Sequence, residues 1–453
     1  MDLFVLGAGL AIGLAGLWVG IGEWLLARKS LHTMGKNPNL GGTMLVITIL
    51  WIALVESAAI YGLIVALQIM WLDFATMAPG VTIGAGLAIG LAGLWVGVGQ
   101  WMLVTGAMEA IHKNPQLKGK LMTFMILFLA LVESAAIYGL VIALMLLGYE
   151  TGMIDMYGAI GAGLAVGLAG LWVGIGEWMI AKRAMQAIGD NPDKIWSFLV
   201  LAILWIALVE SAAIYGLVVS LQIIGQDPSL ALNGLLGAGL AVGLAGLWVG
   251  IGEWMLVKGA MDAIHNKPNL KGKIMTFMIL FLALVESAAI YGLVVAFMLM
   301  GAVGDELLLY SGVGAGLAIG IAGLWAWLGE GIIARRALQL MWRNAALIGT
   351  FLIVTILGIA LVEASAIYGL IVSLQIINMD QSLLTWWMAV GAGIAVGAAW
   401  LWVGKWYVSE GALMAIIRNP AIKTKAMTYM ILFLALVESV AIYGLIVALQ
   451  ILG

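Results

Sequence analysis

Long apolar runs separated by short polar loops repeat six times along the chain. In the first repeat the apolar segments run roughly from Phe4 to Leu31 and from Met44 to Met70, with the polar stretch GKNPNL between them. At about 20 residues for each crossing of a bilayer, this repeat predicts a transmembrane helical hairpin. Six repeats predict an all-α membrane protein with twelve helices. The predicted hairpins 1 to 6 span residues 1–72, 78–149, 155–226, 232–302, 309–379 and 384–453.

Composition supports the membrane assignment. The 453 residues are 64% hydrophobic and only 9% charged, with a mean hydropathy of +1.15, which excludes a water-soluble globular protein. The absence of cysteine excludes disulfides and thiolate metal sites. The basic residues form short loop clusters and no extended basic surface, so we expect no nucleic-acid partner.

The distribution of charge predicts the orientation in the membrane. Every one of the 20 lysine and arginine residues except Lys405 lies in or beside a loop inside a hairpin. The connectors between hairpins carry only acidic residues, such as Asp73, Glu150 and Asp227. Since positive loops remain on the cytoplasmic side, we expect the hairpin loops to be cytoplasmic and both termini to lie on the opposite side.

A glycine pattern marks the first helix of each hairpin. In GAGLAIGLAGLWVGIGEW, Gly9, Gly13, Gly16 and Gly20 follow spacings of 4, 3 and 4 and share one helix face. A face without side chains lets neighbouring helices approach closely. The pattern fits ordinary small-residue packing, or a crowded inner ring in which many first helices share a small circumference.

Each second helix carries a glutamate within its apolar run. The six are spaced by 77, 77, 76, 77 and 75 residues, and they are Glu56, Glu133, Glu210, Glu286, Glu363 and Glu438. A second polar residue precedes each by 33 positions in the first helix: Glu23, Gln100, Glu177, Glu253, Glu330 and Lys405. At about 1.5 Å per residue, both members of a pair lie at a similar depth near the middle of the bilayer.

Burial of these carboxylates needs a physical explanation. An unpaired charge at mid-membrane costs from about 3 to over 10 kcal/mol. Two neighbouring carboxylates cannot both remain ionised without a cation between them. The pairs therefore share a proton or hold a metal ion.

Hydroxyl groups follow each glutamate at fixed spacing. A serine follows at the next position in five hairpins (Ser57, Ser134, Ser211, Ser287 and Ser439), and a tyrosine follows at the fifth position in all six (Tyr61, Tyr138, Tyr215, Tyr291, Tyr368 and Tyr443). Carboxylates, hydroxyls and a backbone carbonyl form an all-oxygen ligand set suited to a hard cation. We therefore expect Na⁺, with H⁺ as the alternative, and no organic cofactor. Ser57 could instead bond to the carbonyl of residue i−4, and Tyr61 could be an interfacial anchor.

These motifs resemble the c-subunit of rotary ATP synthases. The glycine-striped first helix, the basic loop with NP, and the buried glutamate followed by IYGLIVAL together cover essentially the whole chain, six times. The loop KNPNL and the ending YGLIVALQI look more like the F-type branch, and the polar residue 33 positions before ES-x3-Y is similar to the pattern of sodium-binding members. The resemblance implies Glu56 as the essential carboxylate, with Glu23 or Gln100, and Ser57, as side-chain ligands. It also implies the carbonyl of Leu54 as a further ligand and Tyr61 as the residue that holds the glutamate in a locked form.

Three positions depart from this pattern. Gln100 replaces the glutamate of the other hairpins, and hairpin 5 has Ala364 directly after its glutamate with Ser365 one position later. Lys405 replaces the ligand of hairpin 6, where its ammonium could neutralise Glu438 as a bound cation would. We expect this sixth site to carry no ion. The alternative is that Lys405 extends toward an interface.

The resemblance implies an ion-translocating subunit of a membrane rotor ring, without nucleotide-binding activity, since no phosphate loop occurs. Its expected partners are a second copy, giving about twelve hairpins per ring, a stator subunit with an essential arginine, central-stalk subunits on the cytoplasmic loops, and lipids. The alternatives are a secondary ion transporter or channel with intramembrane carboxylates, or an engineered fusion of rotor subunits.

Overall fold

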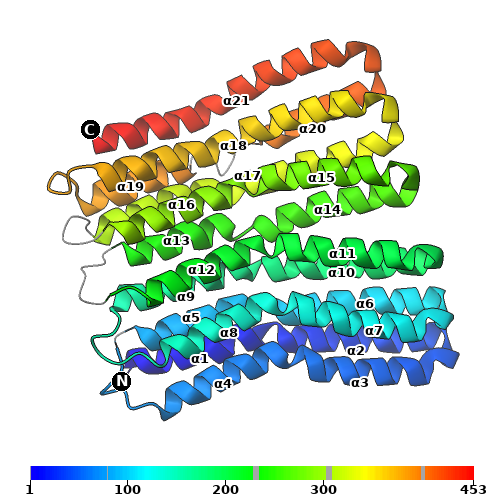
Figure 1. Ribbon diagram of the computed structural model, residues 1–453, viewed down its shortest axis with the longest axis horizontal. Coiled ribbons are helices and arrows are strands. Elements are labelled where there is room, and N and C mark those ends of the chain that lie inside the picture. The colour runs from blue at the N-terminus through cyan, green and yellow to red at the C-terminus, as the bar shows by residue number, and fades with distance from the viewer. Residues whose placement is uncertain (1, 79, 228–233, 303–308, 399–403) are drawn as a thin grey trace. The chain divides into compact units, whose positions relative to one another are not determined.

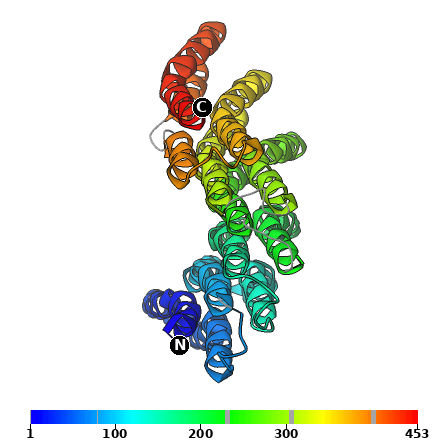
Figure 2. The same ribbon diagram turned by 90° about the vertical axis from the view of Figure 1, so that its left-hand side faces the viewer.

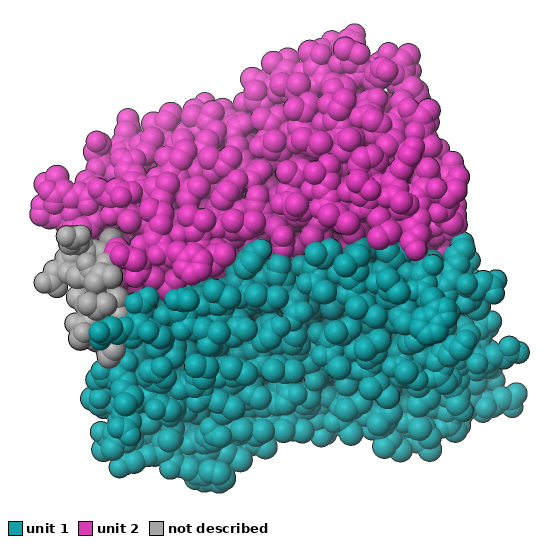
Figure 3. Space-filling view, viewed as in Figure 1, with its two compact units in different colours: residues 1–228 teal, residues 229–453 magenta. Residues whose placement is uncertain are grey.

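The computed structural model describes residues 2–78, 80–227, 234–302, 309–398 and 404–453. The chain divides into two compact units, residues 1–228 and 229–453 (Figure 3). Unit 1 contains hairpins 1 to 3 and unit 2 contains hairpins 4 to 6.

Unit 1 is built from twelve α-helices and three short 3₁₀ turns at the hairpin loops. Hairpin 1 contains α1 (Asp2–Leu17), α2 (Val19–Lys36), η1 (Pro38–Leu40), α3 (Gly41–Val55) and α4 (Ser57–Trp71). Hairpin 2 contains α5 (Val81–Gly93), α6 (Val96–Lys113), η2 (Pro115–Leu117), α7 (Lys118–Val132) and α8 (Ser134–Leu146). Hairpin 3 contains α9 (Met156–Leu171), α10 (Val173–Asp190), η3 (Pro192–Lys194), α11 (Ile195–Val209) and α12 (Ser211–Ile224).

Unit 2 repeats this order with longer helices toward its end. Hairpin 4 contains α13 (Leu235–Gly246), α14 (Val249–Asn266), η4 (Pro268–Leu270), α15 (Lys271–Val285) and α16 (Ser287–Gly301). Hairpin 5 contains α17 (Leu309–Arg343), η5 (Ala345–Leu347) and α18 (Ile348–Asn378). Hairpin 6 contains α19 (Trp386–Ala398), α20 (Lys405–Arg418), η6 (Pro420–Ile422) and α21 (Lys423–Leu452).

The predicted all-α membrane class is confirmed. Within the described residues, 11 helical stretches are long and apolar enough to cross a membrane, and α19 is a shorter apolar helix. The predicted twelfth crossing would join α19 to α20 through residues 399–403, which lie outside the described residues. The described part contains no strand, only an isolated antiparallel bridge between Met77 and Glu150.

The crossings of the first four hairpins are interrupted, which the hydrophobic pattern did not indicate. The second helix of hairpin 1 ends at Val55 and restarts at Ser57, so Glu56 lies at the junction with φ −67° and ψ −14°. The first helix has a similar junction at Trp18. The other glutamates at such junctions are Glu133, Glu210 and Glu286. Helical hydrogen bonds still cross the junction, because the amide of Glu56 donates to the carbonyl of Ile52 at 3.3 Å and the amide of Ile60 donates to the carbonyl of Glu56 at 2.9 Å.

Within unit 1 the first helices form one layer and the second helices another. Helices α1, α5 and α9 pack side by side, as do α2, α6 and α10, whereas the second helices pack mainly on first helices. Helix α4 contacts both α1 and α5, and α8 contacts both α5 and α9, so these two second helices each lie between two first helices. The hairpin loops of the unit lie at one end and the connectors at the other (Figure 1), and Figure 2 views the helices from the connector end.

Glycines allow the first helices of unit 1 to pack backbone against backbone. A Cβ added to Gly90 would lie 2.6 Å from the carbonyl oxygen of Leu10, and one added to Gly97 would lie 2.5 Å from the Cα of Val19. Real side chains do not approach this closely. These contacts favour crowding of the first helices over ordinary small-residue packing as the explanation for the glycine pattern. Tryptophans of successive first helices also contact one another. The ring centroids of Trp18 and Trp95 are 4.4 Å apart in a stacked pair, and those of Trp95 and Trp172 are 5.1 Å apart.

Alanine in place of Gly97 should destabilise the fold by about 1–3 kcal/mol, because its methyl group would overlap the backbone of hairpin 1. Gly119→Ala is the matched control, since no atom of the described residues lies within 4 Å of its Cβ position, and alanine favours a helix more than glycine does. Thermal unfolding of the purified protein in detergent measures both. Equal unfolding temperatures for the two variants would contradict the close packing.

Candidate ion-binding site

The polar residues of the first helices are buried within the units. Gln100, Glu177 and Glu330 have no exposed surface. Each lies beside the glutamate of its own hairpin: Gln100 Nε2 donates to Glu133 Oε1 at 2.5 Å. Glu177 lies within electrostatic reach of Glu210, as Glu330 does of Glu363. The prediction that residues 33 positions apart meet at the same depth is confirmed for these pairs.

Between hairpins 1 and 2, three side chains converge on the carboxylate of Glu133. Ser57 Oγ of hairpin 1 donates to Glu133 Oε1 of hairpin 2, and Gln100 Nε2 lies 3.4 Å from Ser57 Oγ. Tyr61 lies within electrostatic reach of Glu133. The side-chain amide oxygen Oε1 of Gln100 is buried without a hydrogen-bond partner among the described residues. We call this group the Glu133 site.

At two further sites a tyrosine of the preceding hairpin bonds to the glutamate. Tyr138 of hairpin 2 donates its hydroxyl to Glu210 Oε1 of hairpin 3 at 2.5 Å. Tyr291 of hairpin 4 donates to Glu363 Oε1 of hairpin 5 at 2.6 Å. In the described part of the chain, both carboxylate oxygens of Glu177 and of Glu330 are buried without a hydrogen-bond partner.

Each site is therefore shared by two successive hairpins. The expectation that serine and tyrosine serve the glutamate of their own hairpin is wrong for Ser57, Tyr138, Tyr291 and Tyr368, each of which bonds to the next hairpin's glutamate. The reason is helix geometry: successive residues turn by about 100°, so the face with the hydroxyls points toward the next hairpin. The alternative that Ser57 bonds only within its own helix is also wrong, because it reaches Glu133.

Lys405 occupies the site between hairpins 5 and 6. Its Nζ lies 3.1 Å from Glu438 Oε1 and donates to the carbonyl oxygen of Leu361 at 3.1 Å. The predicted pairing of Lys405 with Glu438 is confirmed, and the lysine is 1% exposed, so it does not extend to an interface. Leu361 precedes Glu363 by two positions, as Leu54 precedes Glu56. Tyr368 donates to Glu438 Oε1 at 3.0 Å.

The second departure from the pattern falls at this same site. Ala364 holds in hairpin 5 the position of Ser57 in hairpin 1, whose hydroxyl bonds to the glutamate of the following hairpin. Ser365, one position later, donates to the carbonyl of Val362 in its own helix at 2.9 Å and does not replace the missing hydroxyl. The site where the Lys405 ammonium pairs with Glu438 is thus also preceded by the one hairpin that has alanine, Ala364, in place of the serine.

Two predicted sites are not assembled within a single unit. Glu253 and Glu286 lie in unit 2, whereas Ser211 and Tyr215 lie in unit 1. Glu56 at the start of the chain is exposed, with Glu23 within electrostatic reach, and within the described residues no serine or tyrosine bonds to it. At the other end Ser439 donates to the carbonyl of Leu436 at 2.9 Å, and Tyr443 is exposed.

The donor set suits a small hard cation. Carboxylate, amide and hydroxyl oxygens meet at the Glu133 site, and a carboxylate and a hydroxyl oxygen meet at the sites of Glu210 and Glu363. Within the described residues, no group of three or more histidine, aspartate or glutamate side chains could hold a metal ion. Such a set favours an alkali cation over a transition metal. Carboxylates that are bonded by hydroxyls of the preceding hairpin are an arrangement suited to binding a cation within the membrane-spanning part of the chain.

Comparison with known proteins identifies the family. The family model for the ATP synthase C-subunit matches six successive segments, residues 6–69, 83–146, 160–223, 236–299, 313–376 and 389–451. The chain belongs to the ATP synthase C-subunit family. It is a non-catalytic rotor component of a rotary ATPase, an integral multi-pass membrane protein with six C-subunit repeats.

Relatives of this rotor protein come from several branches. It is 38% identical over 229 residues to the K-subunit of the A-type ATP synthase of Methanocaldococcus jannaschii, covering 49% of this chain and 95% of the relative. It is 50% identical over 68 residues to the ATP synthase c-subunit of Clostridium beijerinckii, covering 15% of this chain and 94% of the relative. A chloroplastic ATP synthase c-subunit from Porphyra purpurea is 48% identical over 65 residues, 14% of this chain and 79% of the relative. No solved structure matches the chain.

The sequence pattern named the polar residues that meet at these sites but not which hairpins share them. It missed Leu361 as a partner of Lys405, although Leu54 at the same position of hairpin 1 was expected to supply a carbonyl. It also missed ion pairs between hairpins near the loops, such as Lys29 with Glu109 at 2.6 Å and Lys113 with Asp190 at 2.5 Å. The near-constant repeat length was the available signal, because these partners lie 80 and 77 positions apart.

Proposed function

We propose that this rotor protein carries Na⁺ at sites shared by successive hairpins. Each site consists of the second-helix glutamate and the polar first-helix residue of one hairpin, together with the serine, the tyrosine and a backbone carbonyl of the preceding hairpin. The observation that carries the proposal is the convergence of Ser57, Gln100 and Glu133. A proton needs one carboxylate and one acceptor, whereas Na⁺ needs several oxygens at once.

Charge balance assigns different roles to the two acidic residues. A site that passes through lipid must be close to neutral. In the Glu133 site one carboxylate and one Na⁺ balance, because Gln100 is uncharged. In the site of Glu177 and Glu210 the same balance requires a proton on one carboxyl. We assign that proton to Glu177, which occupies the position of Gln100 and then acts as a neutral oxygen ligand.

The ammonium of Lys405 supports a silent sixth site. It contacts Glu438 and the carbonyl of Leu361, the groups that a bound cation would contact. A tethered cation cannot leave, so the site remains neutral without exchanging ions. Each chain would then transport five ions per turn, at Glu56, Glu133, Glu210, Glu286 and Glu363, and the ratio of ions to ATP falls in proportion.

The rotor would work against a stator. An ion enters a site through one half-channel, travels round the ring in a neutralised site, and leaves when the stator arginine displaces it. The basic hairpin loops, which we assign to the cytoplasmic side, would contact the central stalk. The ion pairs that join neighbouring hairpins near these loops support a rigid surface for torque transfer.

Protection from carbodiimide tests the choice of ion. Dicyclohexylcarbodiimide reacts with a protonated carboxyl, so bound Na⁺ should slow the labelling of Glu133, Glu210 and Glu363 at slightly acidic pH. Mass spectrometry of the labelled peptides measures each site, and potassium at equal ionic strength is the control. Labelling at these glutamates that is equally fast with both salts would favour protons as the transported ion.

A further inference from the structure

We propose that the chain binds the phosphate group of an anionic lipid between hairpins 1 and 2, at the loop end of α2 and α6. The ammonium groups of Lys36 and Lys113 would hold the phosphate from its two sides. The bound phosphate would replace an ion pair that this interface lacks. Phosphate binding here is independent of the ion that the buried glutamates carry.

Aligned positions just before the loops show which ion pair is missing. The residue directly before the loop asparagine is Lys36 in hairpin 1, Lys113 in hairpin 2 and Asp190 in hairpin 3. Between hairpins 2 and 3 these positions meet, because Lys113 Nζ lies 2.5 Å from Asp190 Oδ1. Between hairpins 1 and 2 the same two positions hold lysines. Two ammonium groups brought together in this way repel each other unless an anion lies between them.

A cavity of about 220 Å³ lies at this pair of lysines. Its lining includes His32 and Lys36 of α2 and His112 and Lys113 of α6. The volume is several times the roughly 30 Å³ that one water molecule takes up, so a phosphate group has room there. A lysine offers three donors and a neutral imidazole offers one N–H, and phosphate oxygens are strong acceptors for both.

The cavity carries an excess of positive charge. The one carboxylate that lines it, Glu109, already pairs with Lys29 at 2.6 Å. Lys113 shares its charge with Asp190. Lys36 makes no ion pair or hydrogen bond with any residue that the structure describes, and its side chain is exposed. An anion in the cavity would therefore compensate Lys36 and relieve its repulsion from Lys113.

Depth in the membrane favours a lipid as the source of the phosphate. Lys36 follows Glu23 by 13 positions, which is about 20 Å along a helix. The hydrocarbon core extends about 15 Å from the middle of the bilayer, and the headgroups occupy about the next 5–7 Å. With Glu23 near mid-membrane, the two lysines lie at the level of the lipid phosphates. Basic pockets between transmembrane helices bind anionic headgroups at this level.

The same combination of charges recurs between hairpins 5 and 6. Arg343 and Arg418 hold the two positions before the loop asparagines, and both are exposed. About two turns before Arg343 on α17, Arg336 pairs with Glu410 of α20 at 2.5 Å. An ion pair with two further cations on its loop side is therefore found at both interfaces. We expect a second phosphate at the arginine pair.

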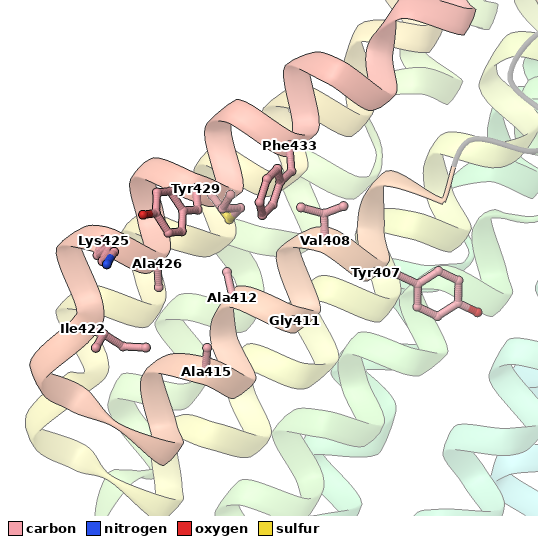
Figure 4. A pocket seen from close by; sticks show the side chains of 11 residues that line it. Tyr407, Val408, Gly411, Ala412, Ala415, Ile422, Lys425, Ala426, Tyr429 and Phe433 are labelled. Atoms are coloured by element: carbon pink, nitrogen blue, oxygen red, sulfur yellow. The ribbon is translucent and has the colours of Figure 1, made fainter.

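Other lysines at this end of the protein have different surroundings. Lys118 at the start of α7 donates to Thr43 Oγ1 at 3.2 Å. The cavity between α20 and α21 has a single cation in its lining, Lys425, whose Nζ lies 5.6 Å from the ring centroid of Tyr429 (Figure 4). Neither place brings two cations together around one cavity, so the groove between α2 and α6 is the favoured phosphate site.

Counting bound lipids tests the proposal. The protein is purified in a non-ionic detergent and titrated with short-chain phosphatidylglycerol, and native mass spectrometry counts the lipids that remain bound. Phosphatidylcholine, whose choline neutralises the phosphate, is the control lipid. We expect saturable binding of two phosphatidylglycerol molecules per chain, and phosphatidylcholine should bind about tenfold more weakly. Equal binding of the two lipids, or no binding of phosphatidylglycerol, would overturn the proposal.

Lys36→Asp is the decisive variant, because it gives hairpin 1 the acid that hairpin 3 has at this position. The new carboxylate should pair with Lys113 as Asp190 does, so the protein should fold and lose one of the two lipids. Lys120→Asp is the matched control, since Lys120 is exposed on α7 and does not line the cavity. Arg418→Asp should remove the other lipid.

The control decides between a site and general attraction of anionic lipid to a basic surface. An unchanged number of lipids in Lys36→Asp would refute the site between hairpins 1 and 2. Equal losses in Lys36→Asp and Lys120→Asp would also refute it. Thermal unfolding gives a second readout, because phosphatidylglycerol should raise the unfolding temperature of the unmodified protein more than that of Lys36→Asp.

Inorganic phosphate distinguishes the two sources of a phosphate group. Added at the same concentration as the lipid, it should leave phosphatidylglycerol bound. Displacement of the lipid by inorganic phosphate would identify the ligand as a free anion and overturn the lipid assignment. If phosphatidylglycerol does not bind and Lys36→Asp instead abolishes co-purification of the central stalk, the cavity receives an acidic side chain of the stalk and the proposal is wrong.

Discussion

Glu210→Gln should lower the affinity of its site for Na⁺ by a hundredfold or more. Removing the charged partner of a buried cation costs about 3–5 kcal/mol, and each 1.4 kcal/mol is a factor of ten in affinity. Equilibrium binding of radioactive sodium to the purified rotor should fall from five ions per chain to four. The tyrosine contact from Tyr138 can be kept by the amide, so the fold should remain intact.

Glu177→Gln is the matched control for this prediction. If Glu177 is the protonated, neutral member of the pair, an amide replaces it with little change in charge, and the affinity should fall by about tenfold or less. Gln100 shows that the same packing accommodates an amide at this position. Equal losses in Glu177→Gln and Glu210→Gln would contradict the division of roles between the two carboxyl groups.

The silent site should be restored by two substitutions together. Lys405→Gln with Ala364→Ser gives the site of Glu438 the ligand set of the Glu133 site: a glutamine, a glutamate, a serine, a tyrosine and a carbonyl. Bound sodium should rise from five to six ions per chain, and Glu438 should become protected from carbodiimide by sodium. Lys405→Gln alone should bind more weakly, because the serine is still absent.

The reverse substitution provides the control. Gln100→Lys should place an ammonium beside Glu133, as Lys405 lies beside Glu438, and reduce bound sodium from five ions to four. A sodium ion bound at Glu438 in the unmodified chain would refute the silent site. So would carbodiimide labelling of Glu438 at the rate seen for Glu133.

The sequence by itself determined the class, the repeat and the identity of the polar residues. Six apolar hairpins can form only helices in a bilayer, because backbone groups in lipid must bond within their own segment. The spacing of 33 residues also placed Gln100 beside Glu133 and Lys405 beside Glu438, since both helices of a hairpin start from the same loop and rise equally per residue.

Only the tertiary structure decided which hairpins share a site. A sequence gives the face on which Ser57 lies but not the neighbour that this face meets, because that depends on how glycine-lined helices pack side by side. The same packing brought Ala364 to the site of Lys405 and so combined two separate departures into one silent site. It also gave hairpins 2 and 5 a packed neighbour on each side within their units.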